Sequence, residues 1–191
     1  MDLIFIRHGQ GEHTLDMPRS LQNKNPPLTS IGIEQARLLK SQFQLIDDDV
    51  IIISPIRRTL DTAIILSENI NCRKIVSPLV SPRMFPILPH KKTLPCDKIL
   101  DLEKIRTEYP TFELDLDSTS KLWSDGINTM AEQTFEELAL SFLRKCKQLN
   151  RERIYIISHD GTITSYRQLI TGKVLSREDF PRETGWFQLR C

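Results

Sequence analysis

Long apolar runs are missing from this chain of 191 residues. No stretch approaches the roughly 18 consecutive apolar residues that a membrane-spanning helix needs. The first ten residues, MDLIFIRHGQ, carry an acid at position 2 and no small-residue cleavage site, so they lack the pattern of a signal peptide. These absences predict a soluble, cytoplasmic protein with no membrane partner.

Net charge is also nearly absent. Lysine and arginine number 26 and aspartate and glutamate 25, which leaves a formal charge of +1. A general nucleic-acid binder needs a basic surface whose contacts release counterions, so this balance argues against a nucleic-acid partner. The four cysteines share no CxxC spacing, so we expect neither a zinc knuckle nor a disulfide framework. Any affinity for anions is therefore expected to be local.

Short β-branched runs alternate with helical patterns along the chain. Strands are expected at residues 2–6, 50–53, 74–76, 154–157 and 186–189. Helices are expected at residues 29–43, 60–67, 98–108, 132–149 and 162–171. Apolar runs without alternation are typical of strands that are buried on both faces of a parallel sheet. The pattern predicts a single α/β domain over residues 1–191, with helices on both faces of a mostly parallel sheet.

Two segments break this alternation. Five prolines and no glycine occur from Pro78 to Pro95, so this stretch forms neither the interior of a helix nor a central strand. Residues 111–124 show no regular pattern. We expect segments at about 77–97 and 111–130 to be caps or loops that shape the entrance to a site.

Three expected strands are followed by side chains suited to anions. Arg7-His8 follows the first strand, Arg57-Arg58 comes shortly after the second, and His159-Asp160 follows a late one. Because the carboxyl ends of parallel strands meet at one edge of a sheet, we expect these side chains to converge. Arginine is always charged and holds two phosphate oxygens at once, so the pocket suits a phosphoryl group.

Phosphoryl transfer depends on positioned positive charge and on an in-line nucleophile. A neutral imidazole supplies such a nucleophile, and a reference pKa of about 6.5 leaves a useful fraction of histidine neutral near pH 7. Neighbouring arginines favour the neutral form. The second histidine is then expected to donate a hydrogen bond to a phosphoryl oxygen.

Four ordered pieces of sequence contain these residues. They are Arg7-His8-Gly9-Gln10, Pro27-Leu28-Thr29 with Gly32 and Gln35-Ala36, Ser54-Pro55-Ile56-Arg57-Arg58-Thr59 with Thr62-Ala63, and Ser158-His159-Asp160-Gly161. With these pieces, the chain resembles the histidine phosphatase (phosphoglycerate mutase-like) superfamily over nearly its full length. The resemblance implies a three-layer α/β/α sandwich with a mostly parallel central sheet, and no metal or organic cofactor.

The resemblance also implies a role for each residue at the sheet edge. His8 is the nucleophile that becomes phosphorylated. Arg7 and Arg58 bind the phosphoryl group, and His159 completes the pocket. Arg58 rather than Arg57 matches the family position, so Arg57 is expected to be a surface charge. The implied activity is metal-independent hydrolysis of a small phosphorylated metabolite, with phosphate as a product.

Other polar residues are further candidates for contacts with the substrate. Gly9 and Thr14 are expected to bind phosphate, Thr14 through its hydroxyl. His13 either touches substrate or is an ordinary loop histidine. The run His90-Lys91-Lys92 either contacts a second anionic group of the substrate or is a solvated face.

One residue that the resemblance leads us to expect is missing. The branch that contains the mutases has a glutamate, the general acid, after the third strand, yet no Asp or Glu occurs from Asn69 through Cys96. Positioned acid catalysis typically contributes about 10²–10⁴-fold. Asp160 is the first replacement candidate, because the acid phosphatase branch has a proton-donating Asp there, and Asp97 is the second. The alternative role for Asp160 is to cap the following helix.

Three other functions stay open. A phosphoglycerate mutase-like phosphotransferase would return the group to a second hydroxyl instead of to water. A catalytically weak phosphate-binding or scaffold module would account for the missing acid. A metal site of His8, His13 and His159 would hold its ligands beside two arginines, which is electrostatically unfavourable.

Overall fold

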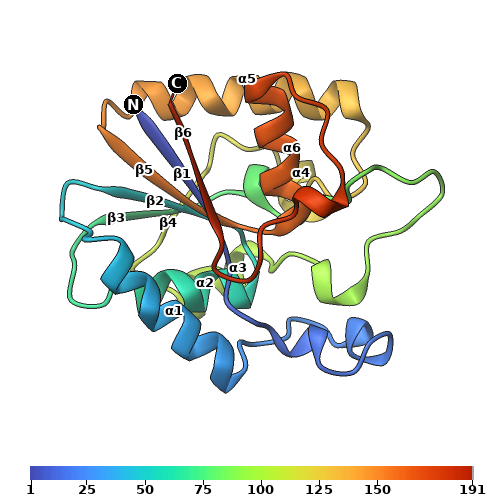
Figure 1. Ribbon diagram of the computed structural model, residues 1–191, viewed down its shortest axis with the longest axis horizontal. Coiled ribbons are helices and arrows are strands. Elements are labelled where there is room, and N and C mark those ends of the chain that lie inside the picture. The colour runs from blue at the N-terminus through green and yellow to red at the C-terminus, as the bar shows by residue number, and fades with distance from the viewer. Residues whose placement is uncertain (191) are drawn as a thin grey trace.

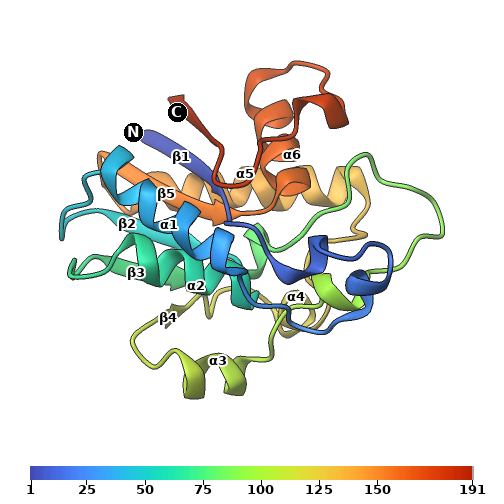
Figure 2. The same ribbon diagram turned by 60° about the horizontal axis from the view of Figure 1, so that its bottom comes forward.

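The chain folds around a six-stranded sheet with the strand order β4-β3-β2-β5-β1-β6 (Figure 1 and Figure 2). The computed structural model describes residues 1–190 of the protein. The strands are β1 (Asp2–Arg7), β2 (Val50–Ile53), β3 (Arg73–Val76), β4 (Glu113–Leu114), β5 (Arg153–Ser158) and β6 (Trp186–Arg190). All neighbours are parallel except β6, which runs antiparallel to β1 at the edge. The predicted mostly parallel sheet is confirmed.

Successive side chains of the central strands fill two separate cores. Leu3 and Phe5 of β1 belong to the core on one face of the sheet, and Ile4 and Ile6 belong to the core on the other face. Strands β2 and β5 divide their side chains in the same way. Since side chains of a strand alternate between faces, a strand that is covered on both sides needs apolar residues throughout. That requirement explains the continuous apolar runs.

Helices cover both faces, which gives the three layers that were expected (Figure 1). One face packs against α1 (Ser30–Gln42), α2 (Arg57–Leu66) and α3 (Leu102–Glu108). The other packs against α5 (Glu132–Gln148) and α6 (Asp160–Thr171). A short helix, α4 (Ser120–Asp125), contributes Leu122 to one core and Trp123 to the other. None of the helices in residues 1–190 is both long enough and apolar enough to span a membrane.

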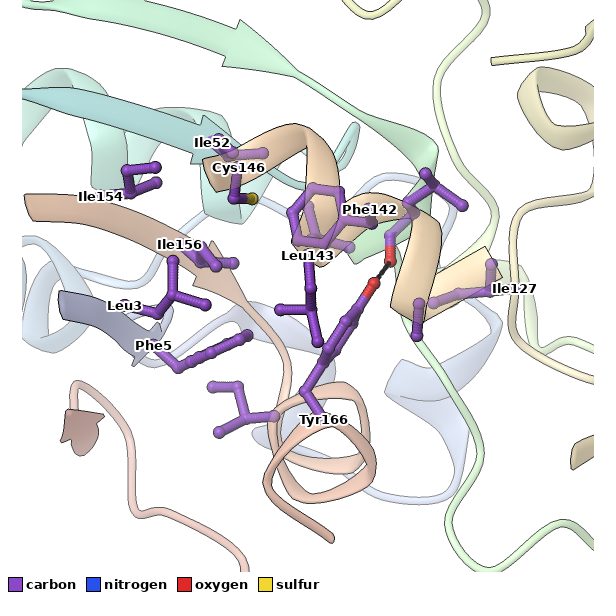
Figure 3. Packing of buried hydrophobic residues seen from close by; sticks show 14 of the residues in the cluster. Leu3, Phe5, Ile52, Ile127, Phe142, Leu143, Cys146, Ile154, Ile156 and Tyr166 are labelled. Carbon is purple, nitrogen blue, oxygen red and sulfur yellow. Dashed lines mark hydrogen bonds between the residues drawn. The ribbon is translucent and has the colours of Figure 1, made fainter. Parts of the chain in front are cut away.

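Tyr166 of α6 belongs to the core drawn in Figure 3. Its ring contacts those of Phe5, Phe135 and Phe142, with centroid distances of 5.3–5.6 Å. Its hydroxyl donates a hydrogen bond of 2.9 Å to the carbonyl oxygen of Leu79. This bond satisfies the one polar atom of a fully buried tyrosine, and it ties α6 to the segment after β3.

Local signals account for the ends of two helices. The Thr29 hydroxyl accepts a hydrogen bond of 3.0 Å from the backbone N–H of Gly32, so Thr29 is the N-cap of α1 as expected. Gly172 ends α6 in the left-handed conformation, with φ 66°.

Several predicted boundaries were wrong, among them the start of α2, which begins at Arg57 rather than at residue 60. Residues 98–101 are not helical. The Asp101 side chain accepts a hydrogen bond from the backbone N–H of Lys104, so Asp101 is the N-cap and α3 begins at Leu102. The stretch from Thr111 to Ser124, expected to be irregular, contains β4 and most of α4. The last helix begins at Asp160 rather than at residue 162.

The proline-rich segment after β3 forms no strand and no α-helix, as expected. It contains only the short 3₁₀ helices η3 (Pro78–Val80) and η4 (Pro95–Asp97). Three more such turns are η1 (Glu12–Thr14), η2 (Arg19–Gln22) and η5 (Arg177–Asp179). In both Figure 1 and Figure 2, the loop between η3 and η4 and the loop with η1 and η2 lie beyond the carboxyl ends of β1, β2 and β5.

Candidate active site

The carboxyl ends of three parallel strands bring the predicted side chains together. Arg7 at the end of β1 is opposite Ser158 of β5, and Ile53 at the end of β2 is opposite Ile157. The backbone N–H of His8 donates a hydrogen bond of 3.1 Å to the carbonyl oxygen of Ser158. The loops that follow these strands therefore leave the sheet at one edge.

The His8 ring is only 2% exposed and is held at both nitrogens. Nδ1 lies 2.7 Å from the carbonyl oxygen of Gly9, and Nε2 lies 3.1 Å from Nε of Arg58. A guanidinium only donates, so Nε2 must accept, and the ring proton is on Nδ1, where it is donated to Gly9. The contacts select a neutral imidazole with its lone pair on Nε2.

His159 forms the same kind of contact with the same arginine. Its Nδ1 lies 3.2 Å from NH2 of Arg58, and its Nε2 lies 2.8 Å from the Ser54 hydroxyl oxygen. By the same reasoning, Nδ1 accepts and Nε2 donates to Ser54. The rings of His8 and His159 have centroids 5.0 Å apart. Donation from Nδ1 to a phosphoryl oxygen would require the ring proton to move from Nε2 to Nδ1.

The electrostatic surroundings keep these imidazoles uncharged. Burial, followed by the charge of Arg58, lowers the pKa of both His8 and His159 well below 6.5. Burial, again followed by Arg58, lowers the pKa of His13 to about 3. All three rings are therefore neutral at pH 7.

Arg58, at the first turn of α2, is 1% exposed and reaches across the site. Besides the two histidines, NH1 donates 2.8 Å to the carbonyl oxygen of Cys96, and NH2 donates 2.9 Å to Oδ1 of Asp97. Its neighbour Arg57 is exposed and is 3.6 Å from Asp61 in an ion pair on the helix surface. The two adjacent arginines thus occupy different environments, one inside the site and one outside.

Arg7 pairs with the second carboxylate of the site. Its NH2 lies 3.0 Å from Oδ2 of Asp160, and its NH1 donates 2.8 Å to the carbonyl oxygen of Pro181. The other oxygen of Asp160 accepts a hydrogen bond of 2.7 Å from the backbone N–H of Gly161. Both oxygens of Asp160 are therefore held by donors. Asp160 is the first residue of α6 and His159 is its N-cap, so the alternative role of Asp160 as the helix cap was wrong.

Asp97, in η4, differs from Asp160 in its surroundings. Burial raises its pKa, and the Arg58 guanidinium opposes that rise. Only its Oδ1 is engaged by Arg58. Asp97 thus lies within the site as a carboxyl group whose neutral form is favoured by burial.

A cavity of about 560 Å³ opens above this cluster. Its wall includes Arg7, His8, Arg58, His159, Asp97 and Asp160. Thr14 also lines it, although its hydroxyl donates 2.9 Å to the carbonyl oxygen of Gly11. Gly9 does not line it, and its N–H lies 3.3 Å from the Thr62 hydroxyl oxygen. Gly9 contacts the site through its carbonyl oxygen, which accepts the hydrogen bond from Nδ1 of His8.

His13 lies closer to His8 than its place in the sequence suggested. Its ring lies on the cavity wall, with its centroid 5.7 Å from that of His8, and its Nδ1 is buried without a partner among the described residues. Lys91 and Lys92 line the cavity, whereas His90 does not. In the sequence, a loop histidine that lines a cavity looks the same as one that does not, and the same holds for the lysines of a basic run.

Other lining residues were not predicted at all. Arg83 is buried beneath the cavity, where it donates to the carbonyl oxygen of Met130 at 2.9 Å, pairs with Glu132 at 2.7 Å and stacks on Phe135. These contacts indicate a structural role. Apolar side chains such as Phe180 complete the wall. Their type and spacing match those of ordinary core residues, so the sequence contained no signal for them.

Two comparisons of the sequence with known proteins found similarities. The sequence profile of the histidine phosphatase superfamily (branch 1) matches residues 3–84. A curated relative from Hydrogenobacter thermophilus, provisionally named phosphoserine phosphatase 2, is 26% identical over 172 residues, which are 89% of this chain and 78% of that protein.

Several solved structures share the fold. The ecdysone phosphate phosphatase of Bombix mori, in complex with tungstate, has a TM-score of 0.65 at 13% identity and covers 100% of this chain and 89% of its own. The alpha-ribazole phosphatase of Shigella flexneri has a TM-score of 0.60 at 19% identity, with 98% and 89% covered. A phosphoserine phosphatase of Entamoeba histolytica, in complex with 3-phosphoglyceric acid, gives the same four values. They confirm the predicted three-layer α/β/α fold.

Proposed function

We propose that this chain is a phosphatase of the histidine phosphatase superfamily and that its reaction passes through a phosphohistidine on His8. The superfamily profile that matches residues 3–84 and the curated phosphatase relative support the assignment. The observation that carries the proposal is the buried, neutral His8, whose Nε2 lone pair faces a guanidinium. A neutral imidazole beside fixed guanidinium donors supplies both a nucleophile and charge for the phosphoryl oxygens.

In the first step, the lone pair of Nε2 on His8 forms a bond to phosphorus while the bond from phosphorus to the alcohol oxygen breaks. That oxygen takes a proton from a carboxylic acid of the site, so the alcohol leaves neutral. The Nε donor of Arg58 leaves Nε2 and binds a phosphoryl oxygen, and Arg7 binds another. The proton on Nδ1 stays hydrogen-bonded to the carbonyl oxygen of Gly9. The ring becomes cationic, and this charge is partly offset by the phosphoryl oxygens.

In the second step, water attacks phosphorus and the bond from phosphorus to Nε2 breaks. The bonding pair returns to His8, which becomes neutral again, and the proton of the water goes to the carboxylate that donated one in the first step. Inorganic phosphate leaves. His159, through a proton on Nδ1, and the Thr14 hydroxyl, on the cavity wall, are proposed to donate hydrogen bonds to phosphoryl oxygens.

Asp160 and Asp97 are the candidates for the proton donor, and the contacts favour Asp97. Both oxygens of Asp160 are engaged, Oδ2 by the Arg7 guanidinium and Oδ1 by the backbone N–H of Gly161. Asp97 is engaged by Arg58 at one oxygen, and its burial favours the neutral form that a donor needs. The order expected from the resemblance is therefore reversed.

Variants of the two carboxylates can be told apart by their activity on esters with different leaving groups. An aryl phosphate releases a stable anion, whereas an alkyl phosphate needs a proton on its leaving oxygen. Asp97→Asn is expected to lower kcat on an alkyl phosphate about 10²-fold more than on an aryl phosphate. Asp160→Asn is expected to have similar effects on both. A selective loss on alkyl esters in Asp160→Asn would make Asp160 the donor.

The proposal extends to the metal and to the substrate. We propose that no metal takes part, because the lone pairs of Nε2 on His8 and Nδ1 on His159 both accept from Arg58. The substrate is proposed to be a small phosphorylated metabolite. The relative named for phosphoserine, and the Entamoeba histolytica enzyme in complex with 3-phosphoglyceric acid, support that size class.

A panel of phosphate esters tests the reaction. Wild type is expected to release phosphate and to be inhibited by vanadate, and His8→Ala is expected to lose activity by at least about 10³-fold. His90→Ala, at an exposed loop histidine that does not line the cavity, is the matched control. Activity that survives in His8→Ala would contradict the proposal.

A further inference from the structure

The cavity has two chemically different parts. Its base carries the cationic and imidazole groups described above, whereas its upper wall is mostly apolar. Three loops supply that wall: the one after β1, with Met17 and Leu21, the proline-rich segment, with Leu88 and Leu94, and the one after α6, with Phe180. The rings of Phe85 and Phe180, 6.1 Å apart, join the second and third loops.

Much of this apolar wall is exposed. Met17 is 64% exposed, Leu88 45% and Leu94 38%, although side chains of this kind are usually covered. Covering apolar surface is favourable by about 25 cal/mol per Å². A ligand with an apolar body would cover these side chains while its phosphate lies at the base.

The volume of the cavity and the charges on its wall restrict the chemical class of the ligand further. About 560 Å³ is ample for a ligand with an aromatic ring and a linker, because sites for drug-sized ligands have volumes of about 300–1,000 Å³. Among the described residues that line the cavity, only Asp97 and Asp160 are acidic, and both are paired with arginines. An ammonium group on the substrate, as in phosphoserine, would find no free carboxylate.

The exposed basic side chains of the wall carry positive charge, the opposite sign to that of the two carboxylates. Lys91, Lys92 and Arg177 line the cavity and are exposed, and none of them forms an ion pair within residues 1–190. Arg177 lies over the ring of Phe180, 5.7 Å from its centroid, so charge and apolar surface are adjacent. These cations repel a cationic ligand and attract an anionic one.

We infer that the substrate is the phosphate monoester of a bulky apolar alcohol that carries a second anionic group and no cationic group. This inference rests on the proposed phosphatase reaction and names its substrate class. The phosphate binds at the histidines, the apolar body covers the wall formed by the three loops, and the second anion binds among Lys91, Lys92 and Arg177.

Three alkyl phosphates with similar leaving oxygens test the apolar wall: 3-phenylpropyl phosphate, glycerol 3-phosphate and phosphoserine. The value of kcat/KM is expected to be on the order of a hundredfold higher for the phenylpropyl ester than for phosphoserine. An equal or higher value for phosphoserine would overturn the inference while leaving the phosphatase reaction intact. If no ester is hydrolysed at all, the proposed reaction itself fails.

A matched pair of leucine variants tests whether the preference for the phenylpropyl ester comes from the apolar wall. Leu88→Ser is expected to lower the ratio of kcat/KM for the phenylpropyl ester to that for glycerol 3-phosphate about fivefold, because it removes apolar contact area. Leu140→Ser, at a leucine of α5 that is 46% exposed and does not line the cavity, should leave the ratio unchanged. Equal ratios in the two variants would overturn the assignment of the wall.

A carboxylated ester tests the cationic side chains. A para-carboxylate on the phenylpropyl ester is expected to raise kcat/KM about fivefold at low salt, and the gain should shrink with added salt. The double change Lys91→Gln and Lys92→Gln should abolish that gain, whereas Lys121→Gln, on α4, should retain it. A carboxylate that gives no gain in wild type, or a gain that survives the double change, would overturn the assignment of the second anion.

Discussion

The Nε atom of Arg58 lies 3.1 Å from Nε2 of His8, the atom proposed to attack phosphorus. In the absence of substrate, the arginine therefore occupies the lone pair that the reaction uses. The contact orients the ring and keeps it neutral, and the same guanidinium also reaches His159 and Asp97. Substrate must take over these donors when its phosphate enters.

Arg58 is therefore expected to matter more than its neighbour. Arg58→Ala should lower kcat about 10²–10³-fold, because it removes donors to the phosphoryl group in the transition state. Arg57→Ala removes an exposed ion pair with Asp61 and should change kcat less than about twofold. Comparison of kcat and KM for the two variants checks this. Similar losses in both would contradict the division of roles.

Stability should fall in acid because His13 is buried in its neutral form. Its pKa is about 3 in the folded chain, against 6.5 for a histidine exposed to water, so the unfolded chain binds the proton first as pH falls. The free energy of unfolding should drop by about 2 kcal/mol between pH 6.5 and pH 5 through His13 alone. Urea unfolding at the two pH values measures the drop.

Variants assign that pH dependence to the residue. His13→Gln should lower the slope of stability against pH in this window by about a third, because the buried neutral His8 and His159 contribute the rest. His90→Gln, at an exposed histidine, should leave the slope unchanged. A slope that is the same in His13→Gln as in wild type would contradict the assignment.

Metal removal should leave the activity unchanged. The two imidazole lone pairs that a metal would need already accept from Arg58, and a cation beside that guanidinium would be repelled. Activity after dialysis against a strong chelator should match that of untreated enzyme. A loss of activity that a divalent ion restores would show that a metal takes part.

Gly161 is expected to tolerate no side chain. A Cβ at this position would collide with the backbone carbonyl oxygen of Arg83, so Gly161→Ala should lower the free energy of unfolding by about 1–3 kcal/mol. Gly172→Ala is the matched control. The structure places no atom within 4 Å of the position that the new Cβ would occupy, so the only unfavourable feature is the backbone φ of 66°, which costs an alanine about 1 kcal/mol. Urea denaturation measures the free energy of unfolding of the two variants. A larger loss in Gly172→Ala would contradict the packing argument.

The sequence predicted the sheet well, because buried parallel strands need apolar residues on both faces, and runs such as Val50–Ile53 meet that need visibly. The convergence of Arg7, Arg58 and His159 followed from the same topology. In contrast, β4 has two residues and depends on pairing with β3 and on the ion pair of Arg73 with Glu113, which are far apart in sequence. Such contacts leave no local pattern.

The cavity wall could not be predicted for a related reason. Met17, Leu88 and Phe180 come from three loops, and each is an ordinary apolar residue in its own segment. Only the folded chain shows that they line one cavity. The preference for Asp97 over Asp160 likewise depends on burial and on occupied hydrogen-bond positions, which the sequence does not contain.

The most direct test of the central claim is to trap the covalent intermediate. Enzyme mixed with a radiolabelled phosphate ester and quenched within milliseconds should carry an acid-labile, base-stable phosphate, and peptide mapping should locate it on His8. His8→Ala should carry no label. Rapid hydrolysis without any labelled protein, or a label on another residue, would contradict the account.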